Sequence, residues 1–190
     1  MPTIGGTGII LIVLGVLILY FIVSYNKIIK LKLRRENAFA DIDVQLKLRF
    51  DLIGNLVNTV KGYASHEKET LTKLTEARTN FMNANGVEDK VNANNQLTGA
   101  LKSLFAVSEN YPDLKANTNF LELQAELSDI ENKLAASRRY FNAATREYNT
   151  VIQVFPSNII ANMFGFNAYN YFELEGAEAE QIKQAPKVKF

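Results

Sequence analysis

The only histidine of the chain, His66, stands directly before Glu67, and this pair is the nearest approach to a catalytic motif. Zinc proteases of the H-E-x-x-H type place two histidines one helical turn apart, so that both bind the metal beside a catalytic glutamate. Here the position of the second histidine is Thr70, and the chain contains no cysteine. A single histidine without cysteine does not complete the usual zinc site. We therefore interpret His66 as a solvent-facing residue or a helix contact.

A second group that could do chemistry is acidic. Asp41, Asp43 and Asp51 lie close together in the sequence, and paired carboxylates can carry out acid–base catalysis. Lys47, however, stands four residues from both Asp43 and Asp51. Helix surfaces use this spacing for ion pairs that contribute a few tenths of a kcal/mol. We therefore predict a solvated helix face here rather than an acid–base pair.

A third group is basic and aromatic. Arg138 and Arg139 beside Tyr140 could clamp an anion, or could bridge to glutamates on a neighbouring helix, and we favour the bridge. The sequence contains no phosphate-binding loop, no G-x-S-x-G and no glycine-rich nucleotide motif. We therefore predict that the chain is not an enzyme, with no catalytic residue, no cofactor and no metal.

Composition narrows the class of protein further. The formal net charge of +1 gives no strong field for binding nucleic acid, so we expect no nucleic-acid partner. The absence of cysteine excludes disulfides, thiol catalysis and cysteine-based zinc sites, and it is compatible with any redox compartment. Prolines stand only at positions 2, 112, 156 and 186, so the long stretch between the first two can be helical almost throughout.

The element that positions everything else is the uncharged stretch Ile4–Val23. Its twenty residues would form a helix of about 30 Å, the thickness of the hydrocarbon core of a bilayer. A cleaved signal peptide would need basic residues before a shorter apolar segment, whereas the first basic residue here is Lys27. A helix that is apolar on every face does not suit the core of a small soluble domain. We predict an uncleaved transmembrane anchor.

A basic cluster directly after the apolar stretch sets the predicted orientation. Lys and Arg are retained on the cytoplasmic side of a membrane span, and all the nearby basic residues follow this one. We predict a single-pass protein with its short N-terminus outside and its large domain in the cytoplasm. The cluster, called the membrane collar below, consists of Lys27, Lys30, Lys32, Arg34 and Arg35.

Two glycines inside the predicted span offer a possible contact with another membrane helix. Gly8 and Gly15 are one heptad apart and so fall on one helix face, where small residues allow close approach. The pattern is not G-x-x-x-G, and glycine is common in membrane helices. One hypothesis for the chain is a sensor that binds an anionic lipid or small ligand. Such a sensor would use these glycines and the membrane collar.

Apolar residues alternate in steps of three and four along most of the remaining chain, which is the pattern of helices packed by heptad seams. We expect one helix over residues 28–82, continuous with the span, whose polar face includes Arg49. We expect a turn at 83–86, a second helix at 89–110, a loop at 113–118 and a third helix from Asn119 to 154. Ser157 is expected to cap a short final helix at 158–164. The first seam is Phe39, Ile42, Leu46, Phe50, Ile53, Val57, Val60, Ala64, Leu71 and Leu74, and the third-helix seam is Phe120, Leu123, Leu127, Ile130, Leu134, Ser137, Phe141, Ala144 and Tyr148.

These elements predict an all-α protein, in which an N-terminal transmembrane helix continues into a long antiparallel bundle of three long helices and a short C-terminal helix. The aromatic segment at 165–172 should pack back on the bundle. Apolar positions off the seams would suit packing between subunits: Phe105, Leu121, Ile152 and Val154. The predicted domains are a tail and anchor (1–26), the bundle (27–175) and a mobile polar tail (176–190).

Long motifs are distributed from the anchor to about residue 175. They are Tyr25-Asn26, residues 41–47, 51–57 and 60–67, Ala77-Arg78, residues 104–116 and 138–142, Tyr148-Asn149, Phe155-Pro156-Ser157 and Tyr171-Phe172-Glu173. With these motifs the chain resembles the LemA family of bacterial membrane proteins. One departure is Gly54, where the family usually has proline, so we expect any bend there to be softer.

The resemblance implies a helical bundle on one N-terminal membrane helix, no known enzymatic activity and a poorly defined role at the bacterial envelope. With the predicted topology, we expect the protein in the bacterial cytoplasmic membrane. Some relatives are associated with membrane-stress proteolysis and one branch with magnetosome formation. Our leading hypothesis is a scaffold that self-associates and organises or remodels the membrane, with the lipid bilayer and further copies as partners. The alternative is an adaptor or regulator of another membrane protein, such as an envelope-stress protease.

Overall fold

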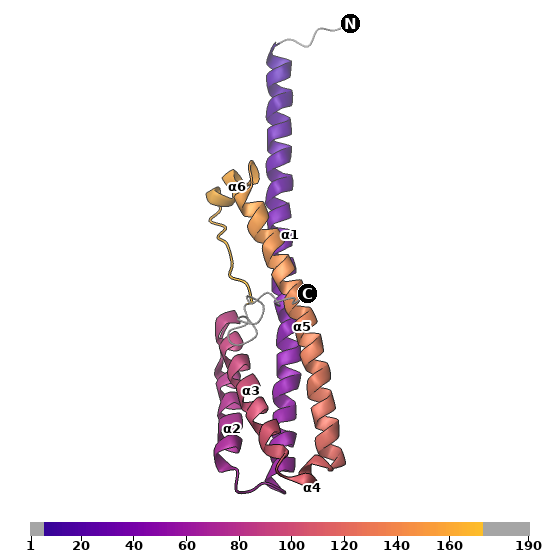
Figure 1. The fold of residues 1–190 in the computed structure, drawn as a ribbon. Coiled ribbons are helices and arrows are strands. Elements are labelled where there is room, and N and C mark those ends of the chain that lie inside the picture. Colours follow the sequence, from indigo (N-terminus) through magenta and orange to yellow (C-terminus); the bar gives the residue numbers. More distant parts are fainter. Residues whose placement is uncertain (1–5, 173–190) are drawn as a thin grey trace, which may run out of the picture. The chain divides into compact units, whose positions relative to one another are not determined.

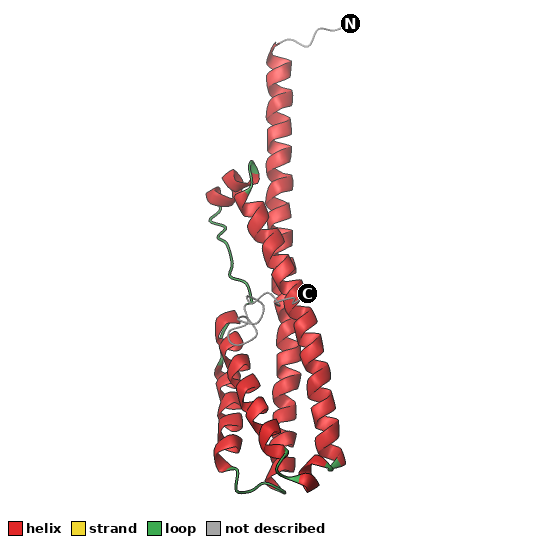
Figure 2. Cartoon of the chain, viewed as in Figure 1, coloured by secondary structure: helices red, strands yellow, loops and turns green. Residues whose placement is uncertain are grey.

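The computed structural model describes residues 6–172, and in this part of the chain helices are joined by turns and loops, without strands (Figures 1 and 2). The all-α prediction is confirmed. The polar tail predicted at 176–190 and the first residues of the predicted anchor lie outside the described residues. The helices are α1 (Gly6–Lys61), α2 (Lys68–Asn83), α3 (Val87–Ser108), α4 (Pro112–Lys115), α5 (Thr118–Gln153) and α6 (Ser157–Met163).

The described residues form two compact units. Unit 1 contains residues 6–39 and 139–171, and unit 2 contains residues 40–138 together with Phe172. Helices α1 and α5 contribute to both units. The predicted boundary at residue 26 separates membrane from aqueous parts of the chain rather than compact units, and it stays a prediction.

Unit 2 is a helical bundle in which α1, α2, α3 and α5 share one apolar core. The seam predicted on α1 is buried, with Ile42, Leu46 and Ile53 fully inaccessible to solvent. The rings of Phe50 on α1 and Phe81 on α2 stack with their centroids 3.8 Å apart. The heptad pattern therefore predicted the core side of α1 correctly. Buried apolar residues of α2, α3 and α5 include Leu74, Leu97, Leu104, Leu127 and Leu134.

The prediction of one helix over residues 28–82 is wrong, because α1 ends at Lys61 and α2 begins at Lys68. Residues 62–67 turn the chain back, and the amide of Ala64 donates to the carbonyl of Val60 at 2.8 Å. Gly62 stands at this break, and glycine costs about 1 kcal/mol in a helix interior. The reversal lets the apolar face of α2 pack against α1, which a continuous helix would not allow. Gly54 does not interrupt α1.

The α2–α3 turn lies where the sequence predicts it. Gly86 takes a φ of 91°, a left-handed angle that glycine adopts without steric cost. The predicted loop at 113–118 instead contains the short helix α4, with Pro112 in its first turn, where the missing N–H is not needed. The cap of α5 is also shifted, because Asn117, rather than Asn119, accepts the amide of Phe120 at 3.0 Å.

Unit 1 has its own apolar cluster, in which the chain after α5 folds back onto α1 (Figure 1). Phe166 and Tyr169 pack against this cluster, so the prediction for the aromatic segment is confirmed at these positions, whereas Tyr171 is 39% exposed. Ser157 does not cap α6 as predicted. Its hydroxyl donates to the carbonyls of Val151 and Val154 and so secures the end of α5. The buried members are Ile28, Tyr148, Ile152, Ile160 and Ala161.

Of the four positions predicted to contact other subunits, Ile152 is buried within its own chain, whereas Phe105 is only partly buried. Ile152 belongs to the core of unit 1, and Phe105 packs edge-on against Phe120 in unit 2, with ring centroids 6.2 Å apart. Both residues therefore serve packing within one chain. Leu121 and Val154 remain about half exposed.

The first part of α1 is long and apolar enough to cross a membrane. Its mean hydropathy reaches 2.8 over the most apolar window, and none of that window is buried by the rest of the chain. A helix with apolar side chains on every exposed face is stable in lipid and not in water. This observation indicates a membrane protein and agrees with the predicted anchor.

Candidate functional site

The residues that first suggested catalysis do not form a catalytic set. His66 is exposed in the connection between α1 and α2. Glu67 next to it accepts a hydrogen bond from the hydroxyl of Tyr111 at 2.9 Å, and this contact raises the pKa of Tyr111. Among the described residues, no group of three histidines, cysteines or carboxylates could hold a metal ion.

The acidic group is also divided by its surroundings. Asp41 and Asp51 are exposed on α1, whereas Asp43 forms an ion pair with Lys90 of α3. The predicted helix-surface pairing with Lys47 is thus replaced, at Asp43, by a contact between helices. Asp43 and Lys90 help to line a cleft of about 280 Å³, which also contains the stacked rings of Phe50 and Phe81.

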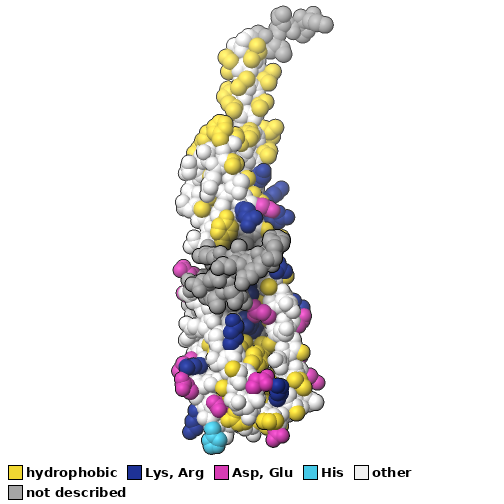
Figure 3. All heavy atoms as spheres, in the orientation of Figure 1, with side chains coloured by type: hydrophobic (Ala, Val, Ile, Leu, Met, Phe, Trp, Pro, Cys, Tyr) yellow, Lys and Arg dark blue, Asp and Glu magenta, His cyan; other side chains and the backbone are white. Residues whose placement is uncertain are grey.

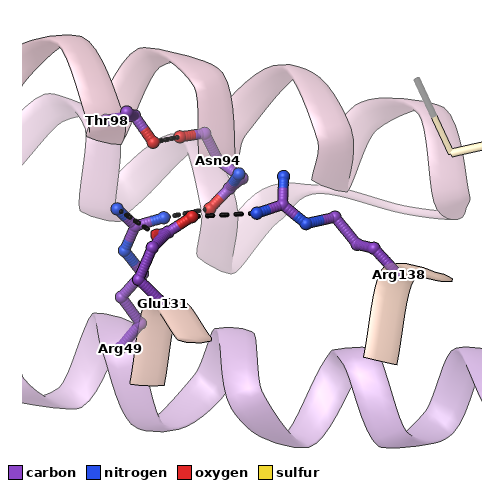
Figure 4. A network of polar contacts seen from close by, with 5 residues as sticks. All are labelled: Arg49, Asn94, Thr98, Glu131 and Arg138. Atoms are coloured by element: carbon purple, nitrogen blue, oxygen red, sulfur yellow. Dashed lines mark hydrogen bonds and ion pairs between the residues drawn. The ribbon is translucent and has the colours of Figure 1, made fainter. Parts of the chain in front are cut away.

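Unit 2 contains a buried network of charged and polar side chains (Figure 4). The sequence pattern within any one helix does not predict this network. Arg49 of α1 is only 4% exposed. Its guanidinium donates to the side-chain oxygen of Asn94 on α3 at 2.6 Å and lies 2.9 Å from the carboxylate of Glu131 on α5. Arg138 donates to the other oxygen of Glu131 at 2.8 Å. One carboxylate therefore joins two arginines, and the network connects three helices.

The electrostatics of the network fit a structural role. Burial lowers the pKa of Arg49, the carboxylate of Glu131 opposes this effect, and the positive charge of Arg138 adds to it. Within α3, the hydroxyl of Thr98 donates a hydrogen bond to the backbone carbonyl of Asn94 at 2.9 Å. A buried charge is stable only when its partners are well placed. The network therefore favours one register of α1, α3 and α5 relative to one another. Its charged groups pair with one another and do not point into a substrate cavity.

The sequence placed Arg49 on the solvated face, and that interpretation is wrong. Its partners stand 45 and 82 residues further along the chain, at Asn94 and Glu131, so no local pattern links them. The bridge predicted for Arg138 is formed with Glu131 of its own helix, and Glu131 then reaches the neighbouring helix through Arg49. Arg139 is exposed.

The membrane collar separates into exposed and engaged residues. Lys27 and Lys30 are exposed, and Lys32 lies 4.0 Å from Glu36 on the same helix. Arg34 donates to the carboxylate of Glu147 at 2.7 Å, and hydrogen bonding with Tyr140 is the main cause that raises its pKa.

Arg35, the last collar residue, has a buried side chain. Its guanidinium lies 4.0 Å from the ring centroid of Tyr169 and 4.7 Å from that of Phe141, between two aromatic faces of unit 1. Burial lowers the pKa of Arg35. Arg35 therefore secures the aromatic segment against α1. The predicted contact of the collar with the membrane surface stays a prediction, and the exposed residues Lys27 and Lys30 are the ones that fit it.

The predicted helix-contact glycines lie on the apolar part of α1. A methyl group added at Gly15 would meet nothing within 4 Å, so the surface around it is open. Gly8 is half-exposed. Their contact with another membrane helix stays a prediction.

Unit 2 also exposes an apolar strip on α1. Val44 is 54% exposed and Leu48, one turn later, is 47% exposed. Further along the helix, Leu52 lines a groove of about 310 Å³ between α1 and α5. We call Val44, Leu48 and Leu52 the α1 strip. Apolar side chains gathered on a polar surface commonly mark an interaction site.

The chain is similar to a known protein family and to several bacterial proteins. The profile of the LemA family matches residues 38–190, which begin after the apolar part of α1. Protein LemA of Metamycoplasma hominis is 27% identical over 173 residues, which are 90% of this chain and 78% of that protein. Magnetosome protein MamQ 2 of Paramagnetospirillum magneticum is 23% identical over 178 residues, and magnetosome protein MamQ of Magnetospirillum gryphiswaldense is 23% identical over 177 residues. Each of these two matches covers 80% of this chain and 65% of the relative.

The family match spans the parts of the chain that form unit 2 and the aromatic segment of unit 1. Neither the family description nor the relatives' names state an enzymatic activity. From the extent of the match, the chain belongs to the LemA family.

Proposed function

We propose that this protein is a non-enzymatic, single-pass membrane scaffold that self-associates and organises or remodels the bacterial cytoplasmic membrane. One observation carries the proposal: the helix that contains the apolar span also presents an exposed apolar strip in the bundle. Val44 and Leu48 are each about half exposed on α1, which runs without interruption from Gly6 to Lys61. The same helix thus offers one surface to lipid and another to a protein partner.

A second copy of the chain is the partner that fits the α1 strip best. Val44 follows Val23, the end of the predicted span, by 21 residues within the helix α1, and this separation in sequence is the same in every copy. Copies with the same orientation in one bilayer therefore present their strips at the same level. A twofold contact pairs like surfaces with like, and confinement to a membrane raises the effective concentration, so modest apolar contacts suffice.

The exposed part of the membrane collar supports the proposed topology. Lys27 and Lys30 are exposed directly after the span, which is the arrangement expected when the following domain is cytoplasmic. A single cysteine placed at exposed Asn92 of α3 tests this, because the natural chain has none. We expect an impermeant maleimide to label Asn92→Cys only after the cytoplasmic membrane is opened. Labelling of intact cells would reverse the topology.

The experiment that tests self-association is the mass of the full-length protein in mild detergent and in lipid nanodiscs, compared with that of a double variant. Val44→Glu with Leu48→Glu places charge on the α1 strip at positions that the fold leaves exposed. The matched control, Asn92→Glu, adds a charge at an exposed position on α3. We expect wild type and control to form regular oligomers and the double variant to form smaller particles at unchanged helicity.

A strict monomer of the wild-type protein in both detergent and lipid would contradict the scaffold proposal. It would favour the alternative, in which the chain is an adaptor or regulator of another membrane protein. Crosslinking in cells through the α1 strip would then yield a stoichiometric complex with a different protein.

A further inference from the structure

The segment around α6 contains no charged residue. No Asp, Glu, Lys, Arg or His stands between Glu147 and Glu173. In a chain where charged residues make up 22% of the sequence, such a stretch is otherwise found only in the N-terminal region that contains the span. The two uncharged stretches are also neighbours in the fold, because both belong to unit 1.

Aromatic contacts place this segment beside the end of the apolar span. The ring centroid of Phe164, just after α6, lies 5.9 Å from that of Phe21 and 4.8 Å from that of Tyr25. Phe166 lies 6.0 Å from Tyr25. Phe21 is inside the predicted span, so these contacts set the level of α6 along α1. Figure 1 shows α6 alongside α1 at this height.

The outward side of α6 and its flanks is apolar and strongly exposed. Phe155 is 79% exposed, Met163 67% and Ile159 54%, and these three residues follow one another at intervals of four. The inward side packs against α1 through Ile160 and Ala161. On the face drawn in Figure 3, the surface of α6 shows hydrophobic and uncharged atoms, without charged side chains. A helix with apolar residues on both sides and no charge is a poor surface for water.

Hydrogen bonds within the chain satisfy polar groups at both ends of the segment, as a lipid environment favours, whereas the buried side-chain oxygen of Asn158 on α6 has no partner. The side chain of Asn149 pairs with Tyr169 in both directions, donating to its carbonyl at 2.9 Å and accepting its amide at 3.0 Å. The end of α6 is closed by two backbone bonds, from Phe166 to Ala161 at 2.9 Å and from Gly165 to Asn162 at 3.3 Å. Gly165 takes a φ of 68°, the left-handed angle of this helix termination.

We propose that α6 and its flanking residues insert into the interface of the same bilayer that α1 crosses, so that each chain holds the membrane at two points. The occupant of the exposed apolar face is lipid, because the face lies level with the span, is continuous with it through Phe21 and Tyr25, and carries no charge that would select a polar partner. Interfacial elements of this kind bury their apolar side about 5–10 Å into the boundary between headgroups and acyl chains.

This insertion goes beyond the proposed scaffold, since it holds for a monomer as well as an oligomer. The chain contains no tryptophan, so a single introduced tryptophan reports its own surroundings without background. The experiment uses full-length Phe155→Trp and Ile159→Trp in nanodiscs of neutral phosphatidylcholine. The control is Met82→Trp on α2, a position that is 73% exposed and apolar but belongs to unit 2.

We expect lipids with brominated acyl chains to remove more than half of the fluorescence of Phe155→Trp and Ile159→Trp, with emission at shorter wavelength than that of the control. We expect Met82→Trp to be quenched by acrylamide from the aqueous side and not by the brominated lipids. Acrylamide quenching of the α6 tryptophans without lipid quenching would overturn the proposal. Protection from both quenchers would also overturn it, because the face would then be covered by protein.

Discussion

The guanidinium of Arg49 lies 2.9 Å from the carboxylate of Glu131, and this contact joins α1 to α5 inside unit 2. Glu131 also accepts a hydrogen bond from Arg138. The negative charge of one carboxylate therefore compensates the positive charges of two buried arginines. The helix α1 also contains the predicted membrane span. The bundle is therefore held to the anchor helix by a charged contact whose loss leaves buried charge unbalanced.

Replacing the shared carboxylate tests the network. We expect Glu131→Gln to lower the free energy of unfolding by roughly 2 kcal/mol, less than for a fully buried pair because Glu131 is 40% exposed. Chemical denaturation in detergent, followed by circular dichroism, measures the change. The control Lys133→Met removes an exposed pair with Asp129 and should change stability by less than about 1 kcal/mol. Equal effects of the two variants would remove the structural importance assigned to the network.

Arg35 is expected to depend on its planar guanidinium rather than on its charge. Arg35→Lys keeps the charge but loses stacking between Tyr169 and Phe141, and we expect a loss of about 1 kcal/mol. Hydrogen exchange of the segment 165–172 should become faster. Arg34→Lys, at the neighbouring exposed position, is the matched control and should leave exchange there unchanged. Wild-type exchange in Arg35→Lys would show that the two ring contacts do not secure the segment.

Tyr148 gives unit 1 a pH dependence in the alkaline range. Burial raises the pKa of its phenol above the ordinary value of about 10, so the folded state favours the neutral form. Above about pH 10 the unfolded chain loses this proton first, and the stability held at lower pH is lost as the pH approaches the raised pKa. We expect the free energy of unfolding of Tyr148→Phe to rise relative to wild type through this range. Parallel stability curves from pH 9 upward would argue against this titration.

Gly54 is a position where alanine should stabilise the chain. A methyl group there would lie 3.4 Å from a terminal nitrogen of Arg78, an ordinary contact with the end of a flexible side chain. Removing a glycine from a helix interior stabilises by about 0.5–1 kcal/mol, and thermal denaturation would detect it. Gly99→Ala on α3, with open space around it, should give a similar gain. A loss at Gly54 with a gain at Gly99 would mean that Arg78 is held rigidly over α1.

The regular features of the fold were predictable because they repeat along the chain. The apolar steps of three and four gave the buried side of α1 and α5, and Asn83-Ala84-Asn85-Gly86 gave the turn that Gly86 forms with its positive φ. The break after Lys61 was harder, since glycine only weakens a helix, and the return of α2 onto α1 decides where the helix ends. Local composition reports how easily a helix breaks, and tertiary packing determines whether it does.

The polar contacts could not be predicted from local spacing. Arg49 next to Phe50 resembles any residue at the edge of an apolar seam, and its burial depends on Asn94 and Glu131 from two other helices. Arg35 resembles the rest of the basic cluster after the span, yet it is buried because Tyr169 returns to it from the far end of the chain. Long-range partners of this kind have no periodic signature.

The measurement that tests self-association most directly is crosslinking in the native membrane before any extraction. Leu48→Cys provides a unique thiol on the α1 strip, and Asn92→Cys provides the matched thiol on α3. The scaffold account predicts a covalent dimer of the full-length chain from Leu48→Cys with a short bifunctional maleimide, and monomer from Asn92→Cys. Monomer from both variants, in membranes where each thiol reacts fully with a monofunctional maleimide, would contradict it.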